Sequence, residues 1–216
     1  MQIVIFGAPG VGKGTQAKIL ASRLKIRHIS TGDILRESIK NKTELGQKAE
    51  KIVDEGNLVP DDLMGKLIKE VLNEEKSRKG YILDGYPRTL NQAKILDGIL
   101  DELKNGVPHY ISIEADDSII IERLSQRRMC SVCESIVSLK KLEDQSVCPF
   151  CNAKNSFIKR EDDDVEVIKN RLNIFHNTTS PVIDHYKRNA NVIVLDGTIP
   201  VSEVTDKIMK VIGVTA

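Results

Sequence analysis

The chain of 216 residues contains no tryptophan, and aromatic residues make up only 4% of it. So few aromatic rings argue against a surface on which nucleic-acid bases stack. An excess of either charge is also missing, because 32 lysines and arginines face 31 aspartates and glutamates, for a net charge of +1. Proteins that coat nucleic acid or anionic membranes usually carry a basic excess. We therefore expect no nucleic-acid or membrane partner, and any anion site must be a local cluster of cations.

Long apolar runs are missing as well. No stretch approaches 18 apolar residues, and the first apolar run has no basic flank, so neither a membrane span nor a signal peptide is expected. The four cysteines all lie between Cys130 and Cys151. Paired cysteines in such a chain favour a metal site over a disulfide framework, and we expect a cytoplasmic protein. Apolar residues still make up 40% of the chain, which is enough for a hydrophobic core.

Short apolar runs alternate with segments of helical periodicity. The runs that predict buried strands are residues 3–6, 81–83, 110–113 and 192–195, with 28–29 as a weaker fifth. Apolar residues recur every three or four positions, as in amphipathic helices, within 63–72, 96–103 and 204–212. This alternation predicts an α/β fold with a five-stranded parallel sheet flanked by helices, and the glycine-rich segment described below makes it a fold of the P-loop type.

Two segments interrupt the alternation. Residues 30–59 are expected to form short helices without a strand, and residues 126–163 hold all the cysteines and few apolar stripes. We expect both to be small domains inserted into a core, which is formed by residues 1–29, 60–125 and 164–216. No long heptad pattern or additional apolar face indicates a partner chain, so a monomer is expected.

A glycine-rich segment, Gly7 to Thr15, follows the first predicted strand and precedes a predicted helix. This is the context of a P-loop, whose backbone N–H groups and helix N-terminus surround phosphate oxygens while a lysine adds a full positive charge. Standard P-loops have Ser or Thr directly after the lysine, on Mg²⁺. Here Gly14 intervenes, which favours a branch other than the Ras-like or ATPase one. The residues expected on ATP phosphates are Gly10, Val11, Gly12, Lys13, Gly14 and Thr15.

The cysteines form two pairs of the type Cys-x2-Cys, separated by fourteen residues. Zn²⁺ prefers four thiolates in a tetrahedron, and such closed sites are structural because no coordination position stays open. Two disulfides or four free thiols are the alternatives. The pattern predicts one structural zinc ion per chain, held by Cys130, Cys133, Cys148 and Cys151.

The P-loop segment and four further motifs follow one another along most of the chain. They are GAPGVGKGT at 7–15, STGDILR at 30–36, GNLVPD at 56–61, DGYPR at 84–88 and DGT at 196–198. Together they resemble the adenylate kinase family, in its bacterial long-lid type. The resemblance implies the reversible reaction ATP + AMP = 2 ADP, with AMP bound by the first insertion and the zinc-bearing second insertion acting as a lid. It also implies that Mg²⁺ accompanies ATP.

The resemblance further implies a clamp of six cations around the phosphates. Phosphoryl transfer depends largely on positioning and charge neutralisation, and the planar fork of arginine binds phosphate oxygens in pairs. The expected catalytic residues are Lys13, Arg88, Arg123, Arg127, Arg160 and Arg171, of which Lys13, Arg123 and Arg127 contact ATP. Asp84 is expected to orient the water shell of Mg²⁺, with a turn or N-cap aspartate as the alternative.

The resemblance also locates the two bases. Thr31 and Gln92 are expected to read the AMP adenine, while residues 57–59 act through the main chain. The residues expected around AMP are Thr31, Arg36, Asn57, Leu58, Val59, Gly85, Tyr86, Pro87, Arg88, Gln92, Arg160 and Arg171. The ATP adenine is expected against Ile136, Val137 and Ile199, and Val137 stands where relatives often carry an aromatic residue.

Two other functions are compatible with parts of the sequence. A kinase for UMP, CMP or GMP would share the P-loop, but pyrimidine kinases of this fold tend to carry alanine at the position of Thr31. A zinc ribbon that binds nucleic acid should be basic with exposed aromatic residues. Residues 134–147 instead contain two lysines, two glutamates, one aspartate and no aromatic residue.

Overall fold

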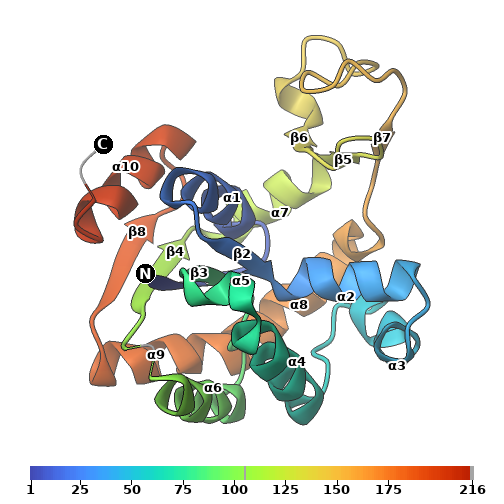
Figure 1. Cartoon of the computed structure of the whole chain (residues 1–216). Helices are drawn as coiled ribbons and strands as arrows, with labels where there is room; N and C mark the ends of the chain where they lie inside the picture. The colour runs from blue at the N-terminus through green and yellow to red at the C-terminus, as the bar shows by residue number, and fades with distance from the viewer. Residues whose placement is uncertain (105, 215–216) are drawn as a thin grey trace.

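A sheet of five parallel strands lies at the centre of the computed structural model, which describes residues 1–104 and 106–214 (Figure 1). The order across the sheet is β2-β3-β1-β4-β8, and each neighbouring pair is parallel. The strands are β1 (Gln2–Phe6), β2 (Arg27–Ser30), β3 (Tyr81–Asp84), β4 (His109–Glu114) and β8 (Val192–Asp196). The predicted fold class is confirmed, and the weak apolar run at 28–29 is the edge strand β2.

Helices cover both faces of this sheet. Alternate residues of a strand point to opposite faces, so Ile3 and Ile5 of β1 join one hydrophobic core and Val4 and Phe6 join another. The first core contains α1 (Lys13–Leu24) and α10 (Val201–Val211), and the second contains α4 (Asp61–Asn73), α6 (Leu90–Leu103) and α9 (Ser180–Asn189). Since both faces are covered, the open crevice for a ligand lies at the carboxyl ends of the strands.

Two helices, α2 (Thr31–Lys40) and α3 (Glu44–Asp54), follow β2 and form a pair beside the sheet (Figure 1). The Ser30 hydroxyl caps α2 by accepting a hydrogen bond from the backbone N–H of Asp33 at 3.2 Å. The two helices touch at Gly46, where a Cβ atom would lie 2.1 Å from the carbonyl oxygen of Ser38. Glycine is therefore required at that position for the backbones to approach.

A separate three-stranded antiparallel sheet, in the order β6-β5-β7, stands apart from the central sheet (Figure 1). It consists of β5 (Arg127–Cys130), β6 (Ile136–Ser138) and β7 (Phe157–Ile158), and we call residues 126–163 the lid. The 3-10 turns Leu139–Lys141 and Glu161–Asp163 lie within it. The remaining helices are α5 (Glu75–Arg78), α7 (Asp117–Ser125) and α8 (Val165–Ile174), the last continued by a π-helical turn, Phe175–Thr179.

Among the described residues, no helix combines sufficient length and apolar character to cross a bilayer.

Candidate active site

A cleft of about 1130 Å³ opens at the carboxyl ends of the central strands, and a recess of about 70 Å³ shares Arg36, Arg88 and Arg171 with it. Every residue predicted to contact a nucleotide lines one or both. The cleft is lined by Gly10, Val11, Gly12, Lys13, Gly14, Thr15, Tyr86, Pro87, Arg123, Arg127, Ile136, Val137, Arg160 and Ile199, besides Asp84. The recess is lined by Thr31, Asn57, Leu58, Val59, Gly85 and Gln92. Residues distant in sequence are thus brought together.

The P-loop connects β1 to α1 and turns at three glycines of positive φ. At Gly7, a Cβ would lie 2.3 Å from the carbonyl oxygen of Ile113, so only glycine fits there. Lys13 folds over the loop, and its Nζ donates to the carbonyl oxygens of Gly7 and Ala8 at 2.8 Å each. Burial lowers the pKa of Lys13 to about 8, against the opposing effect of Asp84. A phosphate in this loop would restore the full charge of the lysine.

Arg88 is held in place by its own segment. Its Nε donates to the carbonyl oxygen of Gly85 at 2.7 Å, and its backbone N–H donates to Oε1 of Gln92 at 2.8 Å. Burial, together with the nearby cation of Arg171, lowers the pKa of Arg88 to about 10. Even so, this pKa leaves the guanidinium charged at neutral pH, in a buried position where an anion would be strongly attracted.

Asp61 is a residue of the site that the sequence analysis did not identify. Its carboxylate accepts hydrogen bonds from Nε2 of Gln92 at 2.8 Å, Oγ1 of Thr89 at 2.9 Å and Nδ2 of Asn91 at 3.1 Å. Both polar atoms of the Gln92 side chain are therefore engaged, one with Asp61 and one with Arg88. The one available signal was its place as the last residue of the GNLVPD motif.

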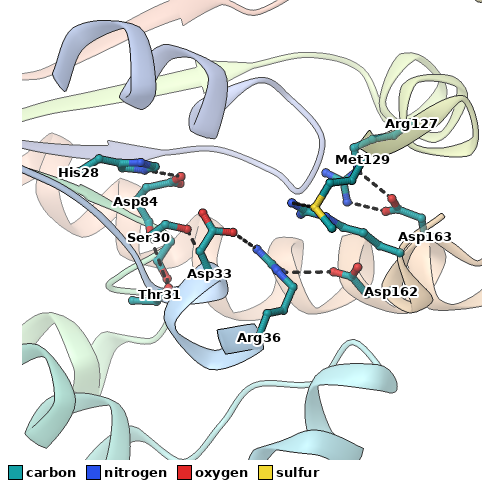
Figure 2. Close-up of polar contacts among 12 residues, drawn as sticks. His28, Ser30, Thr31, Asp33, Arg36, Asp84, Arg127, Met129, Asp162 and Asp163 are labelled. Atoms are coloured by element: carbon teal, nitrogen blue, oxygen red, sulfur yellow. Dashed lines mark hydrogen bonds and ion pairs between the residues drawn. The ribbon is translucent and has the colours of Figure 1, made fainter. Parts of the chain in front are cut away.

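Two adjacent carboxylates, Asp162 and Asp163, provide counter-charges for the arginines of the cleft (Figure 2). Asp163 accepts from Nε and Nη2 of Arg127 at 2.7 and 2.5 Å. Oδ2 of Asp162 lies 3.0 Å from Nη1 of Arg171 and 4.0 Å from Nη1 of Arg36. Burial alone would raise the pKa of Asp162, but Arg171 and Arg36 outweigh it and hold that pKa below its usual value.

In the sequence, these two aspartates belong to a run of four acidic residues, Glu161 to Asp164. The run has a solvated face and a buried one, because Asp162 and Asp163 are buried and Glu161 and Asp164 are exposed. Burial of a carboxylate is tolerated only when it is paired. The acidic run alone does not reveal that Asp163 pairs with Arg127, which lies 36 residues earlier in the chain.

Arg160 has unused hydrogen-bonding capacity. Its Nη2 lies 3.9 Å from the sulfur of Met129, and its buried Nε has no partner among the described residues. Burial lowers the pKa of Arg160 to about 10, and the positive charge of Arg36 adds to the shift. A buried, unpartnered cationic donor is costly, and an anion in the cleft would relieve that cost. Arg123, by contrast, donates to the carbonyl oxygens of Gly197 at 2.9 Å and Val11 at 3.4 Å.

Asp84 ends β3 beside the P-loop. A Cβ at Gly14 would lie 3.4 Å from Oδ2 of Asp84, so the carboxylate reaches the loop closely. The same oxygen lies 3.3 Å from Nε2 of His28 (Figure 2), a contact that sequence reasoning did not identify because the two residues belong to neighbouring strands. Asp84 also lines the cleft, where it could hold the water shell of a metal.

The four cysteines converge at one end of the lid. Sγ of Cys130 lies 3.6 Å from that of Cys151, Sγ of Cys133 lies 3.6 Å from that of Cys148, and all four sulfurs lie within 4.8 Å of one another. These separations exceed the S–S bond of about 2.05 Å, so the thiols are free. Two Zn–S bonds of about 2.3 Å at the tetrahedral angle place sulfurs about 3.8 Å apart. The donor set therefore fits a closed, structural zinc site.

The comparisons with known proteins cover almost the whole chain. The model of the family described as adenylate kinase matches residues 5–191. An adenylate kinase from Caldicellulosiruptor bescii is 42% identical over 214 residues, which covers 99% of this chain and 100% of that protein. An adenylate kinase from Lachnospira eligens is 43% identical over 213 residues, which covers 99% of this chain and 100% of that protein. One from Methanocella arvoryzae is 43% identical over 205 residues, 95% of each chain.

Proposed function

Because this chain belongs to the adenylate kinase family, and so is a nucleoside monophosphate kinase, we propose that it transfers the γ-phosphoryl group of ATP reversibly to AMP and forms two ADP. The observation that carries the proposal is that six predicted cations line one cleft in a chain of net charge +1. Two nucleotides whose phosphates repel each other require such a concentration of positive charge.

On the donor side, Lys13 exchanges its two carbonyl partners for the β- and γ-phosphate oxygens of ATP. The P-loop backbone and the N-terminus of α1 contribute further N–H donors. Mg²⁺, which arrives with ATP, neutralises charge on the β- and γ-phosphates. Asp84 is the residue that would hold its water shell. Arg123 and Arg127 approach the same phosphates from the edge of the lid.

On the acceptor side, Arg88 and Arg36 hold the AMP phosphate at the mouth of the recess. An oxygen of this phosphate attacks the γ-phosphorus, a new P–O bond forms, and the bond to the β–γ bridging oxygen breaks. No general base is needed because the acceptor is already an anion, and positioning and electrostatics supply the rate. Asp61 acts as a positioning residue here, since it orients Gln92 and through it the backbone of Arg88.

The acidic pair of the lid prepares the site for phosphate. Asp162 and Asp163 keep Arg36, Arg127 and Arg171 oriented and partly neutralised while the cleft lacks nucleotides. Phosphate oxygens then replace or share these carboxylates as ligands of the arginines. Arg160, whose Nε finds no partner in the residues that the structure describes, and Arg171 close over the reacting phosphates. Closing excludes water, so that the γ-phosphoryl group passes to AMP rather than to water.

We assign these roles to three parts of the chain: a core of residues 1–29, 60–125 and 164–216, an AMP-binding insertion of residues 30–59, and the lid of residues 126–163. Zinc in the four-thiolate site maintains the shape of the lid and takes no part in the chemistry. The enzyme works as a monomer, because one chain contributes all the proposed contacts. We propose a cytoplasmic location, since four thiolates persist as metal ligands in a reducing compartment.

The direct test is to incubate the protein with Mg-ATP and each nucleoside monophosphate and to count the ADP formed. We expect AMP to be the preferred acceptor, because Thr31 and Gln92 line the recess in which its base would lie. Equal or faster turnover with CMP, UMP or GMP would show that the acceptor is a different base. Absence of ADP with every acceptor would refute the proposed reaction.

A further inference from the structure

The lid carries an exposed aromatic side chain, Phe150, between Cys148 and Cys151. Its relative exposure is 68%, and the other large hydrophobic residues exposed in the described part of the chain are aliphatic. A single exposed apolar residue is common and does not by itself indicate a function. The location and rigidity of Phe150 are what distinguish it.

Phe150 lines the same cleft as the phosphate clamp, together with residues 133–138 of the lid. This wall includes Ile136 and Val137, the lid residues proposed for the ATP adenine. The matching exposed residue of the other cysteine pair is Val132, with a relative exposure of 67%, and it is not among the described residues that line the cleft. The two pairs are therefore alike in exposing an apolar residue but differ in what that residue faces.

The turn that carries Phe150 is fixed at both ends. The backbone N–H of Asn152 donates to the carbonyl oxygen of Cys148, and the N–H of Cys148 donates to that of Ala153, each at 2.9 Å. Sγ of Cys148 lies 3.6 Å from Sγ of Cys133, so the thiolate site ties this turn to the wall of the cleft. A ring on a rigid turn loses little conformational freedom when it meets a ligand.

We propose that Phe150 contacts the base of the donor nucleotide when the lid closes and contributes to the selectivity of the enzyme for ATP. The rest of the proposed base site is aliphatic, namely Ile136, Val137 and Ile199. Each base presents a π face that stacks on aromatic rings, so the ring of Phe150 beside this aliphatic wall would supply the aromatic contact that the wall itself lacks. The inference rests on the proposed function, because it requires ATP in this cleft.

The first experiment measures steady-state rates for Phe150→Ala, with Val132→Ala as the matched control. Loss of a base–ring contact at a partly open edge should raise the KM for ATP about 5- to 30-fold, while kcat and the KM for AMP stay unchanged. Phe150→Tyr, which keeps the ring, should restore the wild-type KM. An unchanged KM for ATP in Phe150→Ala, or an equal rise in Val132→Ala, would overturn the inference.

The second experiment uses Phe150→Trp, which introduces the only tryptophan of the chain. Mg-ATP should quench its fluorescence, and Mg-tripolyphosphate, which has the phosphates but no base, should not. An equal response to both would mean that the ring senses lid closure alone, and the inference would be wrong. If the wild-type protein formed no ADP from ATP and AMP, the proposed function itself would be wrong. If the wild-type protein were active and Phe150→Ala kept a normal KM for ATP, only the inference about Phe150 would be wrong.

Discussion

The pair of Arg127 and Asp163 joins the first strand of the lid to the segment that leads back to the core, and Asp163→Asn would disrupt it. The Asp163 side chain is fully buried and that of Arg127 is 16% exposed, with two hydrogen bonds between them. Removing one partner of a buried pair costs about 3–5 kcal/mol because the other charge stays buried and unpaired. Arg127 borders the cleft and can gain some water, so we expect the lower end of that range, about 3 kcal/mol.

For a chain of this length, about 3 kcal/mol corresponds to a decrease in Tm of roughly 6–12 °C. Thermal unfolding followed by circular dichroism measures it. Asp164→Asn is the control, because Asp164 is exposed, lies 3.8 Å from Lys159, and caps α8 as asparagine also can. Its cost should stay within about 0.5 kcal/mol.

A double-mutant cycle of Arg127→Met and Asp163→Asn isolates the interaction between the two side chains. Because they are in direct contact, the coupling energy should exceed about 1 kcal/mol. A coupling near zero, or a decrease in Tm equal to that of Asp164→Asn, would refute the argument that the lid base depends on this pair.

Four further outcomes are expected. Lys13→Ala and Arg88→Ala should each reduce kcat about 10²- to 10³-fold with the fold intact, and a loss under about tenfold in both would contradict the clamp. Because the pKa of Lys13 is lowered to about 8, the lysine loses its charge as the pH rises through that value. ATP should therefore bind roughly tenfold more weakly at pH 9 than at pH 7. The control variant Lys13→Arg should not show this pH dependence. Within the described part of the chain, the buried hydroxyl of Tyr86 has no partner, so Tyr86→Phe should stabilise the protein by about 1 kcal/mol in urea unfolding, and a destabilisation of that size would contradict this. Cys148→Ser should lower the zinc content below about one ion per chain and decrease Tm, because the metal would stabilise the lid. The circular dichroism of the core helices and a measurable activity should remain. A wild-type protein that contains no zinc when purified would refute the metal assignment.

The sequence by itself determined the features that are encoded in a few neighbouring residues. The P-loop was recognisable because its glycines and Lys13 must follow one another closely to wrap a phosphate. The cluster of four cysteines was recognisable because each Cys-x2-Cys pair places two sulfurs on one turn. The strands were recognisable because a parallel sheet covered on both faces requires continuous apolar runs, as at residues 3–6.

The tertiary structure alone decided which charges and hydrogen-bonding groups meet. Asp61 reaches Gln92 across 31 positions, Asp163 reaches Arg127 across 36, and His28 reaches Asp84 across 56. The sequence around either member of such a pair does not identify its partner, since an aspartate in a polar segment is solvated as often as it is paired. The partner of each carboxylate follows from strand order and from the return of the chain from the lid to the core, because these bring distant residues within hydrogen-bonding distance.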